Sequence, residues 1–152
     1  MQTIQKELLV EASQETAFRV FTEKIDLWWP KSHHVGKTPV VESVLEPGAR
    51  GRWFSRHEDG SEVNVGYVLI WDPYGRLVLV WQIDGNFQCD PQLHSEVEVT
   101  FQREGPVRTR VKLEHRDLEK LMGGKKVIEE MNEGWGYILE LFKALTNKTE
   151  TI

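Results

Sequence analysis

The sequence has one cysteine, no long hydrophobic run and no excess of positive charge, and each of these absences excludes a class of protein. Cys89 alone can form neither a disulfide framework nor a cysteine metal cluster. The longest apolar stretches, such as residues 77–81, are about five residues long and cannot span a bilayer. The 19 Lys and Arg residues are outnumbered by 24 Asp and Glu residues, for a net charge of −5. We therefore expect no nucleic-acid partner and no membrane partner.

The start of the chain also lacks a targeting signal. Met1 is followed by the polar residues Gln2 and Thr3 instead of the apolar core of a signal peptide. Together with the single cysteine, this predicts a cytoplasmic protein. The length of 152 residues is typical of one domain, and we expect residues 1–152 to fold as a single unit.

Aromatic residues are abundant: the chain has six Trp, six Phe and three Tyr. Aromatic side chains bury on the order of 150–250 Å² each. The total area over all these residues is more than a plain core of this size needs. We therefore expect some of them to line a cavity.

Hydrophobic periodicity predicts the order strand, short helices, six strands and a long helix. Ser13 precedes an apolar helical face that contains Ala17, Phe18 and Phe21, so Ser13 is the expected N-cap, and Pro30 ends this helical region. Period-two alternation and turn residues predict the strands. These lie at residues 3–11, 40–45, 52–56, 63–71, 77–83, 96–102 and 110–114.

The last segment, about residues 125–146, has a strong amphipathic helix pattern. Its apolar residues recur at steps of three and four, and they are Ile128, Met131, Trp135, Ile138, Phe142 and Leu145. Such a stripe must pack on another apolar surface, which we expect to be the concave face of the sheet. Gly134 and Gly136 would leave room beside Trp135. The predicted fold class is α+β, with an antiparallel sheet of six or seven strands that holds helices on one face.

Several short sequences occur in an order that resembles the START-like (SRPBCC, helix-grip) superfamily. They are residues 17–22 (AFRVFT), 28–30 (WWP), 48–53 (GARGRW), 66–73 (GYVLIWDP), 76–81 (RLVLVW), 95–101 (SEVEVTF) and 134–135 (GW). Within the superfamily, the chain is similar to the family named for the C-terminal domain of activators of the heat-shock-protein-90 ATPase.

The resemblance implies a curved sheet that grips the C-terminal helix, with a cavity between them. Many members of the superfamily bind hydrophobic small molecules in that cavity, and some carry out chemistry there. The activators also have a separate N-terminal domain that engages the chaperone, and this sequence has no segment that corresponds to it. We therefore expect a protein that binds a hydrophobic or aromatic ligand. A module for protein interaction or stress response, with a chaperone partner, is the first alternative, and a cavity-based hydrolase or cyclase is the second.

No local pattern in the sequence indicates a metal, a cofactor or a catalytic residue. The five histidines, at positions 33, 34, 57, 94 and 115, form no His-x-His, Glu-x-x-His or His-x-x-x-His pair. No Gly-x-Ser-x-Gly nucleophile elbow is present, and the glycines at positions 48, 51 and 60 lie in predicted hairpin turns and not between a strand and a helix, as a phosphate-binding loop would require. The predicted catalytic, metal and cofactor sets are therefore empty. A monomer and a homodimer are both compatible with the sequence.

The candidate ligand site is drawn from the aromatic and apolar residues that these elements would bring together. The hypothesis places side chains of the short helices, the sheet and the long helix around one apolar space, with His115 near its mouth to orient a polar end of the ligand. Ordinary core packing is the alternative interpretation of the same residues. The candidate residues are Trp29, Leu79, Trp81, Phe101, Leu113, His115, Trp135, Ile138 and Phe142.

Overall fold

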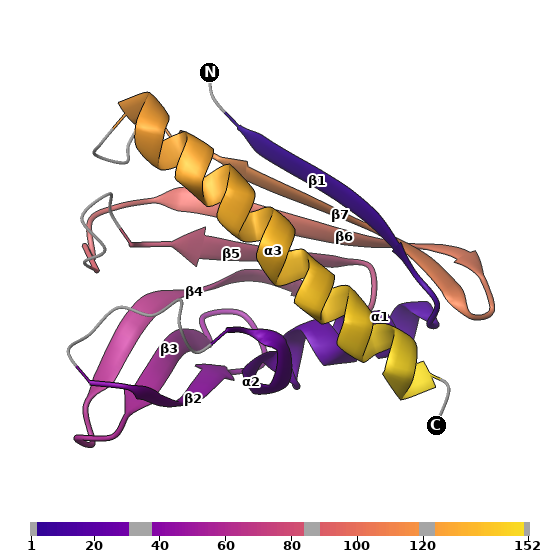
Figure 1. Ribbon diagram of the computed structural model, residues 1–152, viewed down its shortest axis with the longest axis horizontal. Helices are drawn as coiled ribbons and strands as arrows, with labels where there is room; N and C mark the ends of the chain where they lie inside the picture. The colour runs from indigo at the N-terminus through magenta and orange to yellow at the C-terminus, as the bar shows by residue number, and fades with distance from the viewer. Residues whose placement is uncertain (1–2, 31–37, 84–88, 119–123, 151–152) are drawn as a thin grey trace.

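One antiparallel sheet of seven strands dominates the computed structural model, which describes residues 3–30, 38–83, 89–118 and 124–150 (Figure 1). The elements in chain order are β1 (Ile4–Val10), α1 (Gln14–Thr22), α2 (Ile25–Trp28), β2 (Val40–Leu45), β3 (Arg52–His57), β4 (Glu62–Asp72), β5 (Arg76–Trp81), β6 (Ser95–Gly105), β7 (Arg108–Arg116) and α3 (Gly124–Glu150). Across the sheet the strand order is β1-β7-β6-β5-β4-β3-β2. The first strand therefore pairs with the last, and β1 and β2 form the two edges.

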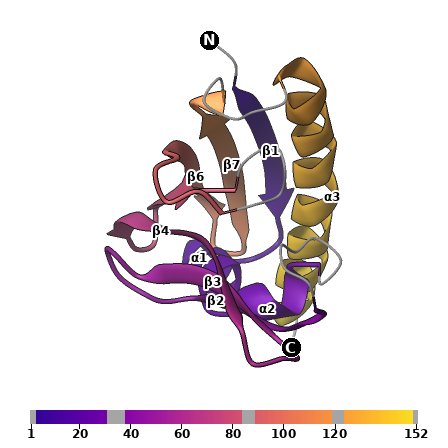
Figure 2. The same ribbon diagram turned by 90° about the vertical axis from the view of Figure 1, so that its left-hand side faces the viewer.

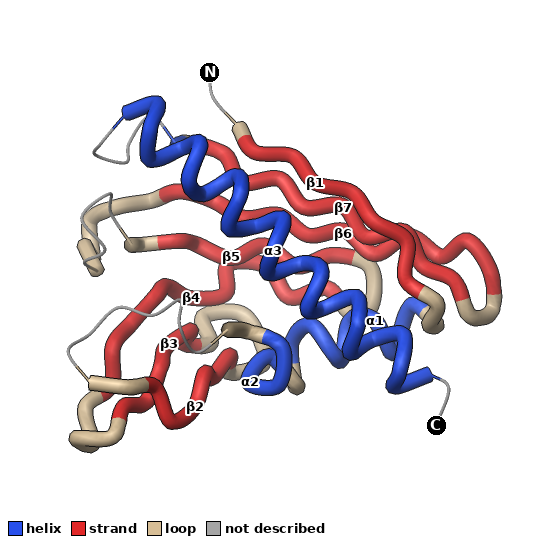
Figure 3. The backbone as a smooth tube through the Cα atoms, viewed as in Figure 1, coloured by secondary structure: helices blue, strands red, loops and turns tan. Residues whose placement is uncertain are grey.

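The two short helices cross one end of the curved sheet (Figure 3). Ser13 caps α1 as predicted, because its Oγ accepts a hydrogen bond from the backbone N–H of Thr16 at 3.2 Å. The α1 face that contains Ala17, Phe18 and Phe21 is buried. The helical region ends at Trp28, two residues before Pro30, as the sequence predicted.

The predicted hairpins are confirmed, with small differences at their ends. β2 pairs with β3, β4 with β5 and β6 with β7, each in antiparallel register. The N–H of Gly75 donates to the carbonyl of Asp72 at 3.1 Å and closes the turn between β4 and β5. β5 ends at Trp81 and not at Ile83, because Ile83 forms only an isolated bridge with Cys89.

The two faces of the sheet have opposite character, and α3 lies on one side of the sheet only (Figure 2). On the outer face, Arg116 forms ion pairs with Glu96 and Glu98 at 2.8 Å each, and Arg76 also pairs with Glu98. Hydrogen bonds from Arg76 and Arg116 hold the pKa of the Glu98 carboxyl below its usual value. The polar alternation predicted for the last two strands is therefore an ion-pair network that faces solvent.

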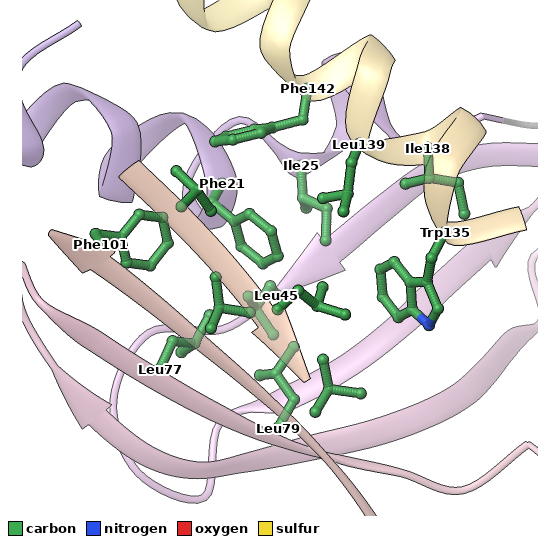
Figure 4. Close-up of a cluster of buried hydrophobic side chains, with 14 of the residues drawn as sticks. Phe21, Ile25, Leu45, Leu77, Leu79, Phe101, Trp135, Ile138, Leu139 and Phe142 are labelled. Carbon is green, nitrogen blue, oxygen red and sulfur yellow. The ribbon is translucent and has the colours of Figure 1, made fainter. Parts of the chain in front are cut away.

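The inner face is covered by α3, which crosses the sheet diagonally (Figures 1 and 4). The centre of its predicted apolar stripe is buried, with Trp135 exposed to 3% and Phe142 to 0%, and the outer residues Ile128, Met131 and Leu145 are partly buried. The helix extends to Glu150, four residues beyond the predicted end. A Cβ at Gly136 would lie 3.7 Å from the ammonium of Lys6, an ordinary contact distance, and nothing lies within 4 Å of such a position at Gly134. The expectation that both glycines accommodate Trp135 is therefore wrong.

The burial of Trp135 gives a direct test of the helix–sheet contact. Trp135→Ala is expected to lower the free energy of unfolding by about 3–5 kcal/mol, since it removes a buried indole and leaves a cavity. Tyr137→Ala, two residues further along the same helix, is the control because Tyr137 is 53% exposed, and its expected change is below about 0.5 kcal/mol. Urea titrations of both variants measure the difference, and equal midpoints would contradict this packing of α3.

Candidate functional site

Four indole rings meet on the inner side of the sheet, from the residue that follows α2 and from β3, β5 and α3. We call Trp29, Trp53, Trp81 and Trp135 the tryptophan cluster. The ring centroids lie 5.5 Å apart for Trp29–Trp53, 5.5 Å for Trp53–Trp81, 5.9 Å for Trp81–Trp135 and 5.8 Å for Trp135–Trp29. The contacts therefore close into a cycle, and their interplanar angles of 55–87° are the tilted and edge-to-face arrangements that aromatic pairs prefer.

The register of the sheet explains why the rings of Trp53 and Trp81 touch. Trp53 on β3 pairs with Gly66 on β4, and Gly66 pairs with Trp81 on β5. No side chain of β4 therefore separates the two rings. A Cβ on Gly66 would collide with the carbonyl oxygen of Val80, so the close approach of β4 and β5 requires glycine at this position.

Burial differs within the cluster. Trp53 and Trp135 are 2% and 3% exposed, whereas Trp29 and Trp81 are half-buried. The tryptophan cluster is therefore part of the core on one side, and on the other it presents aromatic surface to solvent. Trp29 and Trp81 are therefore the members of the cluster whose rings a molecule outside the core could contact.

His115 on β7 connects the cluster to the sheet through hydrogen bonds. Its Nδ1 accepts from the indole Nε1 of Trp135 at 3.2 Å, and its Nε2 lies 3.1 Å from Oγ of Ser95. The Ser95 hydroxyl donates to the carbonyl oxygen of Trp81 at 2.9 Å. The His115 ring also packs against the rings of Trp81 and Trp135, with centroids 5.3 and 6.1 Å away.

These partners fix the protonation of His115. An indole nitrogen can only donate, so Nδ1 of His115 must accept and the single ring proton must lie on Nε2, where it is donated to Ser95. Burial lowers the pKa of His115 from 6.5 to about 3, because the charged imidazolium would lose its hydration. His115 is therefore a neutral side chain that orients Trp135. The prediction that it stands at the mouth of a cavity is wrong, because the residue is 0% exposed.

The other predicted residues divide between this cluster and a second aromatic group. Phe101 and Phe142 both contact Phe21, with ring centroids 5.8 and 5.3 Å away. Phe142 also lies 5.3 Å from Trp28, whose ring is 5.8 Å from Trp29. Phe101 and Phe142 are thus buried in a phenylalanine-rich part of the core, and Trp28 connects this part to the tryptophan cluster.

The three predicted aliphatic residues lie in the same core. Leu79 lies two residues before Trp81 on β5, and it pairs with Val68 on β4 and Val97 on β6. Leu113 on β7 pairs with Val99, two residues after Val97 on β6. Ile138 is on α3 near Trp135 (Figure 4). Leu79, Leu113 and Ile138 are at most 5% exposed, so they support the rings from behind.

Sequence reasoning missed Trp53, Gly66 and Ser95 as parts of this site. The alternation of residues 52–56 does place Trp53 on one face of its strand, which was the available signal. The contact between Trp53 and Trp81 depends on the register of three strands, which alternation alone does not define.

No metal centre is present within residues 3–30, 38–83, 89–118 and 124–150, where no group of three His, Cys, Asp or Glu side chains could hold an ion. His57 lies between Ser55 and the carbonyl of Thr38, and His94 is 2.7 Å from Glu96. His33 and His34 lie outside the described residues. In the same part of the chain, no helix is long and apolar enough to cross a membrane.

A groove lies away from the tryptophans, between the start of β1 and the first half of α3. It has a volume of about 320 Å³, and its lining includes Glu129, Asn132 and Glu133. Ile4 and Ile128 also line it, so this open surface is partly apolar, but it contains none of the aromatic residues. The tryptophan cluster is therefore the better candidate for an aromatic ligand.

Comparison with known proteins places the chain among relatives of the same fold. The sequence model of a family described as Activator of Hsp90 ATPase homolog 1-like protein matches residues 11–147. No curated protein sequence matches the chain.

Solved structures resemble the chain over nearly its whole length. The anthrahydroquino-gamma-pyrone synthase Txn09 is 35% identical, with a TM-score of 0.69, over 95% of this chain and 96% of that one. The self-sacrificing resistance protein CalC from Micromonospora echinospora is 32% identical, with a TM-score of 0.74, over 97% of this chain and 95% of that one. The Aha1 dimer from Colwellia psychrerythraea has the same fold at 15% identity, with a TM-score of 0.60, over 97% of each chain.

The neutral state of His115 predicts a pH dependence of stability. The folded-state pKa of about 3 lies below the ordinary value of 6.5, so the unfolded chain binds a proton between these values and the folded chain does not. Stability from this residue is therefore complete above about pH 6.5 and falls as the pH decreases toward 3. In urea unfolding at pH 4 to 7, the free energy of unfolding should increase with pH more steeply for the wild type than for His115→Gln. The two slopes should differ by at most about 1.4 kcal/mol per pH unit. Parallel slopes would mean that His115 can bind a proton in the folded protein.

Two glycine substitutions test the register around the cluster. Gly66→Ala is expected to lower the free energy of unfolding by about 3 kcal/mol or more, because its Cβ would meet the backbone of β5. Gly134→Ala is the matched control, since its Cβ would enter open space on a helix, where alanine is favoured by roughly 1 kcal/mol. Thermal denaturation of both variants should give shifts of opposite sign.

Proposed function

This chain belongs to the Activator of Hsp90 ATPase homolog 1-like family, and we propose that it is a small-molecule binding protein whose ligand is a planar aromatic compound. The ligand lies against the tryptophan cluster, between the sheet and α3. The single observation that carries the proposal is the closed cycle of four indole rings in which Trp29 and Trp81 are only half-buried. A cytoplasmic location is part of the same proposal.

The geometry assigns different roles to the cluster residues. Trp29 and Trp81 offer exposed ring surface and are proposed to stack on the ligand, because flat aromatic molecules bury the most area against such rings. Trp135 and His115 are buried and hold the first two rings in place from behind. Leu79, Leu113, Ile138, Phe101 and Phe142 are proposed to act one layer further back, as the packed support of this surface.

The similarity to Txn09 supports an aromatic ligand. That protein is 35% identical over almost the whole chain, and its name describes a synthase that makes a fused aromatic product. The name of CalC describes a resistance protein and gives no reaction. The fold alone does not decide between binding and catalysis, so the function must be argued from the site.

The state of His115 favours binding over catalysis. It is the titratable side chain in contact with Trp81 and Trp135, and both of its ring nitrogens already have hydrogen-bond partners. A general acid or base must reach the reacting atoms and change its protonation near the working pH. A buried imidazole with a pKa of about 3 does neither.

A protein-interaction module, the first alternative, has less support. Exposed large hydrophobic side chains in the described residues are distributed over α2, β2, β4, α3 and the turn between β6 and β7. They are Leu27, Val41, Leu69, Val107 and Tyr137. We therefore base the proposal on the tryptophan cluster.

Ligand binding is tested with an aromatic and an aliphatic probe of the same charge. Anthraquinone-2-sulfonate is expected to quench tryptophan emission and to stabilise the fold, by about 2.7 kcal/mol at a concentration one hundred times the Kd. Dodecyl sulfonate, below its micellar concentration, is expected to do neither.

Two variants locate the site. Trp81→Phe should weaken binding of the aromatic probe, since it removes half-buried ring surface from the cluster. Trp71→Phe should leave the affinity unchanged, because Trp71 packs on Phe18 at the other aromatic group, with centroids 5.2 Å apart. If neither probe changes emission or stability, the protein is not a binder of this class. Equal effects of the two probes would indicate a lipid-like ligand.

A further inference from the structure

The sheet contains two hydrogen-bonded serine–histidine pairs whose bonds run in opposite directions. In the pair of Ser95 and His115, the indole of Trp135 donates to Nδ1, so Nε2 carries the ring proton and donates it to Oγ of Ser95. The Ser95 hydroxyl donates its own proton to the carbonyl of Trp81 at 2.9 Å. The ring of His115 therefore takes no proton from this serine.

In the second pair, Ser55 and His57 on β3, the direction is reversed. Oγ of Ser55 lies 2.7 Å from Nε2 of His57, and Nδ1 of the same ring lies 2.7 Å from the carbonyl oxygen of Thr38. A carbonyl oxygen can only accept, so Nδ1 carries a proton, and in the neutral ring Nε2 is the acceptor. The Ser55 hydroxyl therefore donates to His57. A hydroxyl bonded to a base that a third group orients is the arrangement of an activated nucleophile.

This second pair lies on the same side of the sheet as the tryptophan cluster. Trp53, Ser55 and His57 alternate along β3 and therefore share one face of the strand. Phe54 lies on the opposite face, where Cζ of Arg52 is 4.1 Å from the centroid of its ring. Ser55 and His57 are 7% and 3% exposed, so water competes little for either partner and the bond between them is strengthened.

A ligand on the cluster can extend to Ser55. Two residues along a strand span about 7 Å, so Ser55 follows directly after Trp53 on the inner face. The ring of Trp53 contacts the half-buried rings of Trp29 and Trp81. On the neighbouring strand Ser55 pairs with Val63, which is also half-buried. The path from the exposed ring surface to the hydroxyl therefore runs along partly open side chains.

We propose that Ser55 and His57 give this protein an esterase activity toward aryl esters, with Ser55 as the nucleophile and His57 as its general base. The aryl group lies against the tryptophan cluster and the ester group lies at Ser55. This inference rests on the proposed function for its substrate class, and it adds a reaction to the binding proposed there. His115 has no part in the reaction.

The reaction consists of two steps. Oγ of Ser55 bonds to the ester carbonyl carbon, the bond from this carbon to the aryl oxygen breaks, and the hydroxyl proton passes through Nε2 of His57 to the leaving aryl oxide. A water molecule then attacks the acyl group on Ser55 and gives a proton to Nε2. The carboxylic acid leaves, and Ser55 regains its proton from His57. The Thr38 carbonyl accepts from Nδ1 in both steps, so it holds the ring while Nε2 gains and loses the proton.

The test substrate is 1-naphthyl acetate, which has two fused rings and releases fluorescent 1-naphthol. The wild type is expected to hydrolyse it at least about 100-fold faster than Ser55→Ala or His57→Gln, which is the lower end of what a positioned general base contributes. Ser61→Ala is the matched control and should keep the wild-type rate. This serine is exposed in the turn after β3, and its hydroxyl donates to Asp59 at 2.6 Å instead of to a histidine.

A second measurement uses the unmodified protein, so that it does not depend on the folding of a variant. Diisopropyl fluorophosphate reacts with an activated serine hydroxyl, releases fluoride and leaves a phosphoryl group on the oxygen. Peptide mass spectrometry is expected to find this group on Ser55. Ser95 is the internal control and should stay unlabelled, since its hydroxyl donates to a carbonyl and not to a base.

Binding of anthraquinone-2-sulfonate separates this inference from the proposed function. If the wild type binds this probe but neither hydrolyses 1-naphthyl acetate nor is labelled at Ser55, the aromatic site stands and the catalytic role of Ser55 is refuted. The role is also refuted if Ser55→Ala keeps the wild-type rate. If hydrolysis depends on Ser55 although the probe does not bind, the catalytic pair stands and the proposed ligand class is wrong.

Discussion

The hydrogen bond from the indole nitrogen of Trp135 to Nδ1 of His115 joins the C-terminal helix to β7 of the sheet. Because the bond determines which ring nitrogen carries the proton, it also directs Nε2 of His115 to Ser95 and the Ser95 hydroxyl to the Trp81 carbonyl. One chain of donors and acceptors thus links α3, β7, β6 and β5. The orientation of the Trp135 indole depends on it, and a protonated His115 would place two donors against each other. Burial and hydrogen bonding therefore favour the same neutral state.

The aromatic residues have two separate tasks in this fold. Phe18, Phe21, Phe101 and Phe142 are each at most 2% exposed, so they account for the core between α1, the sheet and α3. The tryptophan cluster is less completely buried, and its Trp135 ring is connected by hydrogen bonds to His115 and, through His115, to Ser95. Trp28 connects the two groups. The large aromatic content of the sequence thus reflects core packing and a candidate site together, and the sequence analysis could not separate the two.

The sequence was sufficient to predict elements whose pattern is local. The α3 stripe, the Ser13 cap and the three hairpins each depend on residues close in the chain, and all were predicted. The site was predicted only in part. Strand alternation placed Trp81 and His115 on the inner face. Alternation shows which face a side chain is on but not how deeply it is buried, and for this reason His115 was placed near solvent. The meeting of Trp53 with Trp81 over Gly66 needs the register of three strands, and the bulge between Trp53 and Phe54 alters that register locally.

The charged side chains of these strands lie on the outer face of the sheet, and this distribution decides what kind of molecule the inner side can accept. Glu96 and Glu98 lie on the outer face and form ion pairs there with Arg76 and Arg116. The two inner rows around the cluster are uncharged. They consist of Trp53, Gly66, Trp81 and Ser95 in one row, and Val68, Leu79, Val97 and His115 in the next. A charged group placed against these rows would lose its hydration without a counter-ion, which is unfavourable, whereas the transfer of a neutral aromatic ring from water to such a surface is favourable. The inner side therefore accepts an uncharged aromatic surface more readily than a charged one.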